Sequence, residues 1–468
     1  MYTPITTRWW PLFILFYSTL VTALLQQSVN AASFKYRGVA LGGWLVLEPY
    51  ITPSLFLPFN SSDIPVDEYH FCKQLGPEEA LKQLETHWQT FYNQSDFERI
   101  KGYGLNMVRI PIGYWAFEKL PGDPYVMGAQ KYLDKAIEWA AENDLKVWVD
   151  LHGVPGSQNG FDNSGLRNIG YPGWFNHTEN LSLTHKVLKQ IYTKYGNINN
   201  SSSTLYQETV IAIEVVNEPL GPLLDMNKVK QFYSETYKDA RELQSINNTI
   251  VFHDAFQPMG YWNTFKNLPQ ISNNITNTTL KNYNILIDHH RYEVFSSGAL
   301  NETIAQHLSS IESFAQDIGD EQSHHPAVVG EWSAALTDCT PWLNGVGLGS
   351  RYEGQEPYTN SRIGDCSNIN NWSKWSKEQK KNYRKFVEMQ LDQYSNHTQG
   401  YIFWTFKTET TIEWDFERLV QYEIMPQPLD SRKYIFNGTD TDKSKSNGIR
   451  ISANGWLTSV LVLILVCI

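Results

Sequence analysis

The sequence predicts a single (β/α)8 barrel in the α/β class, and three observations support this. Apolar runs of strand length alternate along the chain with amphipathic stretches whose apolar residues recur at three-to-four spacing. Alternating strands and helices indicate a parallel sheet, and eight strands over roughly 400 residues fit a closed barrel. No glycine-rich phosphate loop follows the first strand, which disfavours the alternative, a doubly wound nucleotide-binding sheet.

The expected elements can be placed along the chain in order. Strands, apolar and rich in β-branched or aromatic residues, are expected at 38–44, 106–112, 146–151, 210–216, 249–254, 285–290, 327–332 and 400–406. Representative helices are expected at 132–141, 229–243, 304–318 and 377–394. No internal repeat or domain linker interrupts the pattern, so one barrel domain is expected over residues 32–436.

Residues 1–31 are predicted to be a secretory signal peptide. Arg8 precedes an apolar run from Trp9 to Leu25, and small residues around Ala31 suit cleavage. The run is short for a spanning helix, so a membrane anchor is the less favoured alternative.

The last part of the chain predicts attachment of a GPI lipid. A polar stalk at 437–446 leads to small residues and then to a propeptide at 447–468 that ends in an apolar tail. The attachment residue is expected at Ser446 or Asn447, with Gly448 the remaining candidate. The alternatives are a tail anchor and a merely apolar C-terminus. The prediction places the protein at the cell surface, on the plasma membrane or the cell wall, with the lipid as its only membrane contact.

Composition supports an extracellular protein and disfavours some partners. Thirteen Asn-x-Ser/Thr sequons fit a glycosylated surface: Asn60, Asn93, Asn176, Asn180, Asn199, Asn200, Asn247, Asn274, Asn277, Asn301, Asn371, Asn396 and Asn437. The net charge of −11 argues against a nucleic-acid partner.

The four cysteines fit an oxidising compartment. Cys339 and Cys366 bracket a glycine-rich loop and can form a disulfide, while Cys467 would leave with the C-terminal tail. Cys72 lies in an apolar helical stretch and is expected to be a buried free thiol.

Two glutamates stand at the ends of two apolar strands and suggest catalysis. Glu218 follows the run at 211–216, and Glu331 follows the run at 327–330. A buried carboxylate must be paired or must shift its pKa, so structural salt bridges are the alternative for each. Two such carboxylates at strand tips are the pair that glycosidic-bond hydrolysis needs.

Other polar or aromatic residues fall at strand ends of the same predicted barrel. They are Arg109, His152, Asn217, His290 with Tyr292, and Trp404. In a (β/α)8 barrel the catalytic groups gather at the C-terminal tips of the strands. Taken singly, each of these residues has a structural explanation, as a salt-bridge partner, a core histidine or a core tryptophan. Such explanations account less well for all of them at the same end of the barrel.

Longer strings resemble glycoside hydrolase family 5 and, within it, the fungal exo-1,3-β-glucanases. The short motifs are Asn-Glu-Pro at 217–219, Gly-Glu-Trp at 330–332 and Val-Arg-Ile-Pro at 108–111. The longer strings lie at 41–54, 152–163, 288–295 and 342–347, and the resemblance runs from Phe34 to Glu413. It implies a retaining enzyme, without metal or cofactor, that releases glucose from the non-reducing ends of β-1,3-glucan.

The resemblance also implies residue roles. Glu218 would be the acid/base and Glu331 the nucleophile. Arg109 and Tyr292 would hydrogen-bond the nucleophile, Asn217 would bind the sugar 2-hydroxyl, and His152 and His290 would orient these groups. Trp404 would be the floor on which glucose stacks, with Glu48, Tyr50 and Asp162 closing the pocket. Phe161 and Phe295 would clamp the next sugar at the entrance.

One residue departs from the family's histidine strand, which carries a third histidine where this chain has Arg291, with Glu293 after Tyr292. Alternation along the strand predicts that Arg291 points away from the site. The functional hypothesis is a monomeric exo-1,3-β-glucanase of cell-wall remodelling. The alternatives are an endo-β-glucanase or transglucosylase on the same scaffold, and a catalytically silent glucan-binding wall protein.

Overall fold

A closed barrel of eight parallel strands, paired in sequence order from β1 to β8 and back to β1, forms the centre of the computed structural model. The structure describes residues 34–168, 171–198, 204–267, 284–434 and 436. The strands are β1 (Tyr36–Ala40), β2 (Met107–Gly113), β3 (Lys146–Gly153), β4 (Val210–Glu214), β5 (Thr249–His253), β6 (Ile285–Arg291), β7 (Ala327–Trp332) and β8 (Gly400–Phe403). The predicted (β/α)8 (TIM) barrel is therefore confirmed.

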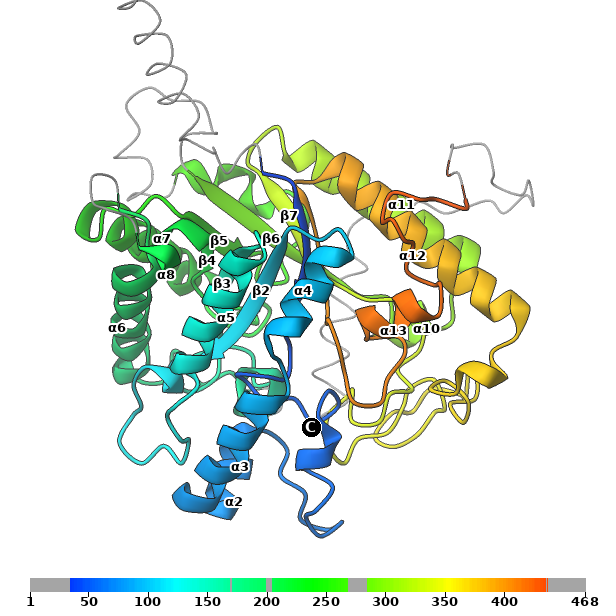
Figure 1. The fold of residues 1–468 in the computed structure, drawn as a ribbon, viewed down its shortest axis with the longest axis horizontal. Helices are drawn as coiled ribbons and strands as arrows, with labels where there is room; N and C mark the ends of the chain where they lie inside the picture. The colour runs from blue at the N-terminus through cyan, green and yellow to red at the C-terminus, as the bar shows by residue number, and fades with distance from the viewer. Residues whose placement is uncertain (1–33, 169–170, 199–203, 268–283, 435, 437–468) are drawn as a thin grey trace, which may run out of the picture.

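Helices surround the strands on the outside (Figure 1). They are α2 (Glu68–Leu75), α3 (Pro77–Thr90), α4 (Gln94–Gly102), α5 (Gln130–Glu142), α6 (Thr178–Tyr195), α7 (Leu205–Thr209), α8 (Met226–Lys238), α10 (Ser297–Leu300), α11 (Ile304–Glu321), α12 (Lys377–His397) and α13 (Phe416–Gln421). Short helical turns are η2 (Pro53–Leu55), η3 (Tyr114–Ala116), η4 (Asp162–Ser164), η5 (Asp239–Leu243), η6 (Tyr261–Asn267) and η8 (Trp372–Lys374). Within these described residues, no helix combines the length and the apolar character needed to cross a membrane.

Several predicted boundaries differ from the observed ones. β1, β4 and β8 end a few residues earlier than the strands predicted at 38–44, 210–216 and 400–406. The chain leaves the ladder there to form the loops of the mouth. The helix predicted at 229–243 ends at Lys238 and continues as the π-helical turn η5. The strand at 327–332 has the predicted bounds.

Two packed layers build the core. Apolar side chains between the strands and the outer helices form the larger layer. The smaller layer fills the inside of the barrel and extends toward its C-terminal mouth, with Tyr36, Ala40, Met107, Trp148, Ala212, Val251, Leu286, Val328 and Ile402. The inside of the barrel is thus a filled core, and a substrate site is expected at its mouth.

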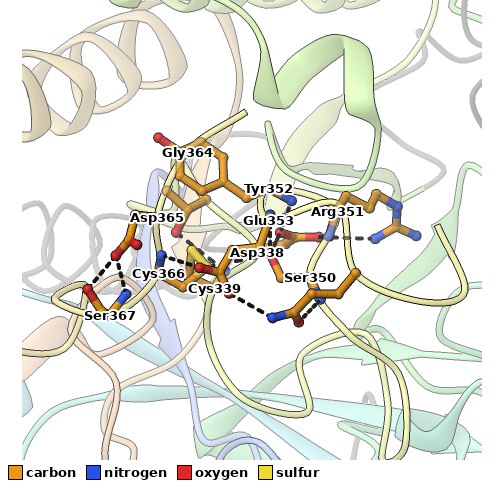
Figure 2. Close-up of a disulfide and its surroundings, with 12 residues drawn as sticks. Asp338, Cys339, Ser350, Arg351, Tyr352, Glu353, Gly364, Asp365, Cys366 and Ser367 are labelled. Carbon is orange, nitrogen blue, oxygen red and sulfur yellow. Dashed lines mark hydrogen bonds and ion pairs between the residues drawn. A yellow bond between two sulfur atoms is a disulfide. The ribbon is translucent and has the colours of Figure 1, made fainter. Parts of the chain in front are cut away.

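The loop after β7 is closed by the Cys339–Cys366 disulfide (Figure 2). The buried Asp338 carboxylate organises this loop by accepting hydrogen bonds from the Ser350 hydroxyl and from the backbone N–H groups of Arg351 and Tyr352. Cys72 is buried and free, as expected. The predicted signal peptide, stalk, propeptide and ω residues Ser446 and Asn447 lie outside the described residues, and the domain boundaries drawn around them remain predictions.

Candidate active site

Glu218 lies four residues beyond the end of β4, in a backbone conformation that its neighbours fix. The chain stays extended after Glu214, since Asn217 N–H donates to the Leu151 carbonyl. The Gln158 side-chain amide donates to the Asn217 carbonyl over 2.8 Å. Glu218 itself has φ of +47°, a region that non-glycine residues enter at a cost. These bonds hold the strained turn and direct the carboxylate over the barrel.

Glu331 lies inside β7, next to a glycine that makes room for the site. A Cβ on Gly330 would collide with the Asp288 carboxylate, so only glycine fits there. The pairing of β6 with β7 shifts register between His289 and His290, so that His290 is paired with Glu331. An irregularity of this kind re-aims side chains near a site.

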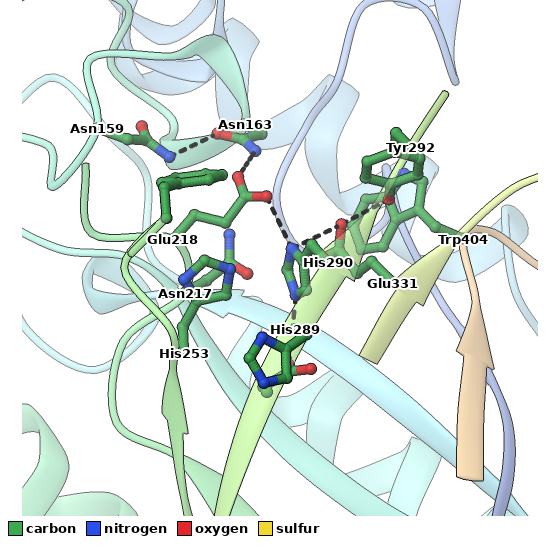
Figure 3. Close-up of polar contacts among 12 residues, drawn as sticks. Asn159, Asn163, Asn217, Glu218, His253, His289, His290, Tyr292, Glu331 and Trp404 are labelled. Carbon is green, nitrogen blue, oxygen red and sulfur yellow. Dashed lines mark hydrogen bonds and ion pairs between the residues drawn. The ribbon is translucent and has the colours of Figure 1, made fainter. Parts of the chain in front are cut away.

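His290 bridges the two glutamates (Figure 3). Its Nδ1 lies 2.7 Å from Glu218 Oε1 and 3.3 Å from Glu331 Oε2. These two oxygens are therefore separated by no more than the sum of the two distances, about 6 Å. The Asn163 amide also donates to Glu218, over 3.1 Å, and the Tyr292 hydroxyl donates to Glu331 over 2.7 Å. The two carboxylates predicted from the sequence thus share one pocket.

Arg109 binds Glu331 from the inside of the barrel. Its Nη1 donates to Glu331 over 2.5 Å, while its Nη2 donates to Glu214 over 2.7 Å and to Asn217 Oδ1 over 2.8 Å. Asp150 lies 3.2 Å from the same nitrogen. Arg109 was expected at a strand tip, but it is the third residue of β2 and points into the barrel. The long guanidinium side chain reaches the mouth from that depth.

His290 is a buried group that can bind a proton, and it lies between the carboxylates of Glu218 and Glu331. Burial opposes protonation of His290, but the carboxylates of Glu331 and Asp288 raise its pKa well above the ordinary value. Burial also acts to raise the pKa of Glu218, yet the hydrogen bond and charge of His290 lower it overall. Burial raises the pKa of Glu331, against the charges of His290 and Arg109. The opposite shifts of Glu218 and His290 favour a proton on His290 beside an ionised Glu218.

One wall of the site combines His152 with aromatic rings. His152 Nδ1 lies 2.6 Å from Asp150, and its ring stacks on Trp404 with 8° between the planes. The Trp404 indole N–H donates to the Tyr50 hydroxyl over 2.6 Å. Tyr50 packs edge-on against Trp414, which also lies against Tyr292. Trp404 therefore lies in one aromatic cluster with Tyr50, Trp414 and Tyr292, and its role as a floor for glucose remains a prediction.

Glu48 and Asp162 form an acidic end of the pocket. Glu48 is 5% exposed, and burial together with the charges of Asp162 and Glu331 raises its pKa well above the ordinary value. Burial raises the pKa of Asp162 to about 6, with the nearby charge of Arg167 opposing the rise. Phe295 packs on Tyr292 and Trp414, whereas the described residues give no ring contact between Phe295 and Phe161. Both rings are half-buried, and the expected clamp on the next sugar remains a prediction.

Sequence reasoning missed several groups of this site. Asp150 and Asp288 precede His152 and His290 by two residues on β3 and β6, and alternation along a strand places such pairs on one face. That spacing could have predicted both carboxylates, and Glu214 on β4 likewise points inward to Arg109. Asn163 lies in the short turn η4 and Trp414 in a loop, where the sequence carries no comparable signal.

Two groups of side chains in this region have the composition of metal ligands. Glu218, His253 and His290 form one, and Glu214, Asp288 and His290 form the other. His290 belongs to both, and its two nitrogens already hydrogen-bond Glu218 and Asp288. The Arg109 guanidinium beside Glu214 adds a positive charge that disfavours a cation there. The geometry fits a hydrogen-bonded proton network better than a metal centre.

Comparisons with known proteins agree with this geometry. A family model described as cellulase (glycosyl hydrolase family 5) matches residues 72–345. Glucan 1,3-beta-glucosidase 2 of Candida albicans is 57% identical over 465 residues, covering 96% of this chain and 95% of the relative. A sporulation-specific glucan 1,3-beta-glucosidase of Saccharomyces cerevisiae is 48% identical over 426 residues, covering 89% of this chain and 90% of the relative. The crystal structure of rutinosidase from Aspergillus niger shares the fold, with a TM-score of 0.61 and 18% identity over 85% of this chain and 99% of that one.

Proposed function

The chain belongs to glycosyl hydrolase family 5 and is a glycoside hydrolase, and on that premise we propose that it releases glucose from the non-reducing ends of β-1,3-glucan with retention of configuration. The observation that carries the proposal is the Glu218–His290–Glu331 bridge. Its upper limit of about 6 Å is compatible with the separation of about 5–5.5 Å that a double displacement requires. An inverting pair stands about 6.5–9.5 Å apart, because a water molecule must fit between substrate and base.

Glu331 is the better nucleophile of the two. It accepts hydrogen bonds from the Arg109 guanidinium and the Tyr292 hydroxyl, and both stabilise its ionised form. These bonds also fix the carboxylate below the anomeric carbon of a sugar that stacks on Trp404. The Glu331 oxygen attacks that carbon, the bond to the leaving glucan oxygen breaks, and a covalent glucosyl-enzyme forms.

Glu218 supplies the proton to the leaving oxygen. It must first gain a proton, and His290 Nδ1 offers one over a 2.7 Å hydrogen bond. Formation of the ester removes the charge of Glu331 and with it one of the carboxylates that hold the proton on His290. In the second step Glu218, now ionised, takes a proton from water, which displaces the sugar from Glu331.

We assign the recognition of glucose to polar groups near Glu218 and Glu331, beginning with two that lack a hydrogen-bond partner among the described residues. The Asn217 amide nitrogen and His152 Nε2 are buried and have no hydrogen-bond partner among the described residues. A donor at Asn217 suits the sugar 2-hydroxyl, whose hydrogen bond strengthens as the oxocarbenium ion develops. Glu48, Tyr50 and Asp162 would bind the remaining hydroxyls and close the pocket, which supports removal of one glucose at a time.

The proposed location is the cell surface, in cell-wall remodelling, through a GPI lipid near Ser446 or Asn447. Support comes from the sequence of the segments outside the described residues. A phosphatidylinositol-specific phospholipase C should release the protein from intact cells, and retention of all the protein after treatment would refute the lipid anchor.

Product analysis on laminarin and on a 1,6-linked glucan tests the activity. Glucose as the sole early product from laminarin supports the proposal, whereas a ladder of oligosaccharides from the start would favour an endo-β-glucanase. Longer products that appear only at high laminarin concentration would indicate transglucosylation. Unchanged laminarin hydrolysis by Glu331→Gln would refute the assigned chemistry, and binding without hydrolysis by the native protein would favour a silent glucan-binding protein.

A further inference from the structure

The loops after β3 and β7 meet above the barrel, although these two strands lie on opposite sides of it. In the closed order β1 to β8, β3 and β7 are separated by three strands on either side. Arg167 follows η4 on the β3 loop, and Val346 lies on the β7 loop. Arg167 Nη1 donates to the Val346 carbonyl over 2.7 Å. A single side chain therefore joins opposite rims of the mouth.

The β7 side of this contact is held rigidly. Asn344 donates to the buried Asp338 carboxylate over 2.9 Å, and Arg351 donates to Asn344 over 2.6 Å. The disulfide anchors the same loop beside Asp338 (Figure 2). Gly345 has φ of +108°, and a Cβ there would meet Arg167 Nη1 at 3.0 Å. A glycine at this position gives the guanidinium room to reach the carbonyl.

The β3 side is also fixed, through the loop after β1. Arg167 N–H donates over 2.6 Å to Asp67, a fully buried carboxylate that also caps the first turn of α2. The Gly165 carbonyl accepts bonds from Tyr69 N–H and from the Tyr125 hydroxyl, each over 2.9 Å. Three loops of the mouth, those after β1, β3 and β7, thus converge at Arg167.

The joined segments carry walls of the substrate pocket. Asp162 precedes Arg167 on the same loop, and the charge of Arg167 acts on the Asp162 carboxyl. Leu343, on the β7 turn, packs in the same cluster as Tyr50 and Trp404. A groove that admits an internal stretch of glucan must be open at both ends of the site. A tie between opposite rims is a feature that can block one of these ends.

We propose that Arg167 determines the exo specificity of this enzyme, as a positioning residue that closes the pocket beyond the terminal glucose by joining the β3 and β7 loops. The inference rests on the proposed function, because it explains why one glucose and not a longer fragment leaves. Arg167 need not take part in bond cleavage. Its loss is expected to open the groove and to admit internal glucan segments, while the Glu218–His290–Glu331 bridge stays in place.

Laminarin whose non-reducing ends have been oxidised with periodate provides the test. Periodate cleaves the vicinal diols of the terminal residue, but internal 1,3-linked residues have none, so only internal attack can degrade the product. The native enzyme should act on laminarin and not on the oxidised form. In R167A, the ratio of activity on oxidised laminarin to activity on laminarin should rise by about tenfold or more, the scale of one lost hydrogen bond from a charged donor.

Two further variants complete the design. G345A leaves Arg167 and its charge in the chain but crowds the guanidinium, so the ratio should rise in the same direction while the pH profile of this variant stays native. R37A removes an exposed ion pair with Asp430 at the far end of the barrel and should leave the ratio native. If the native enzyme is strictly exo-acting and folded R167A or folded G345A keeps the native activity ratio, the role of Arg167 is overturned and the proposed function is not. Hydrolysis of oxidised laminarin by the native enzyme would instead overturn the proposed exo function.

Discussion

Arg109 and His290 carry the positive charge that allows so many carboxylates to lie together in the barrel. Asp150, Glu214 and Glu331 all contact the Arg109 guanidinium. A buried ion costs several kcal/mol of desolvation unless its partners and hydrogen bonds offset that cost, so these groups depend on one another. The same dependence keeps the nucleophile fixed before substrate arrives.

The two glutamates should respond differently to removal and chemical rescue. Glu331→Gly and Glu218→Gly should each lower kcat on an activated aryl glucoside, the latter within the range of about 10²–10⁴-fold typical of a lost acid/base. Azide should rescue both variants, because the small anion fits the space left by either carboxylate. The nucleophile variant should yield α-glucosyl azide and the acid/base variant β-glucosyl azide, as identified by NMR. The opposite assignment of anomers would exchange the two roles.

Loss of Arg109 should destabilise the fold as well as abolish activity. R109M leaves buried carboxylates without their partner, and removal of one member of a buried ion pair costs about 3–5 kcal/mol. The free energy of unfolding in denaturant measures the effect. R37A, which removes an exposed pair, should cost no more than about 1 kcal/mol. Equal effects of the two substitutions would contradict the account of the buried cage.

Sequence patterns predicted the inward-facing groups best where strands present them. Glu331 and His290 lie on strands, and strand alternation and the barrel rule together placed them at one mouth. Alternation also predicted that Arg291 leaves the site, and its guanidinium lies over the Phe314 ring of α11 and contacts Glu293. Asn163 and Trp414 escaped prediction because loop conformation depends on contacts distant in sequence.

At the scale of elements, small irregularities position the catalytic groups. The register shift between β6 and β7 sets His290 against Glu331, and the early end of β4 leaves room for the turn at Glu218. Neither feature follows from hydrophobic periodicity, which records which face is buried and not where a ladder slips. Strand ends were for this reason predicted less well than strands.

Glu413, in the loop after β8, joins the β7 loop to α12 by hydrogen bonds and should make the stability of the fold depend on pH. Burial raises the pKa of Glu413 to about 7, although Tyr383, Leu336 and Thr337 donate hydrogen bonds that oppose the rise. A folded pKa above the unfolded value means that this contribution is complete below about pH 4.5 and is lost as pH rises through 7. Between pH 5 and 8, wild type should therefore lose about 2 kcal/mol of unfolding free energy relative to E413Q. A difference that is constant with pH, or that grows in favour of wild type, would contradict this expectation.

Removal of the disulfide should loosen the β7 loop and, through it, the pocket. The bridge closes a segment with a sequence separation of 27 residues, and a loop of this size is worth about 3–4 kcal/mol in the chain-entropy model. The double variant C339S/C366S should have a lower thermal midpoint, and its KM for laminarin should rise more than its kcat falls, because Leu343 lies in that loop. Reductant should shift wild type toward the double variant and leave the double variant unchanged. A native midpoint in the double variant would contradict the expected anchoring.

At the scale of the whole molecule, the fold was predictable because its signal repeats eight times. Each strand is a short apolar run, most are followed by an amphipathic helix, and errors of a few residues at single boundaries do not change the topology. The closing of the mouth was not predictable, since Arg167 and Val346 are 179 residues apart and each lies on an irregular loop. The signal peptide, stalk and GPI segment remain predictions, because they lie outside the described residues.

The stereochemistry of the first product tests the central claim most directly. Proton NMR of a laminarin digest, recorded within the first minutes and before mutarotation, reports the anomeric configuration of the released glucose. Because Glu218 and Glu331 share one pocket at a separation of no more than about 6 Å, the account predicts that β-glucose appears first and that the α-anomer grows only later. Initial release of α-glucose would show that water attacks directly, and it would contradict the double displacement on which the assigned roles of both glutamates depend.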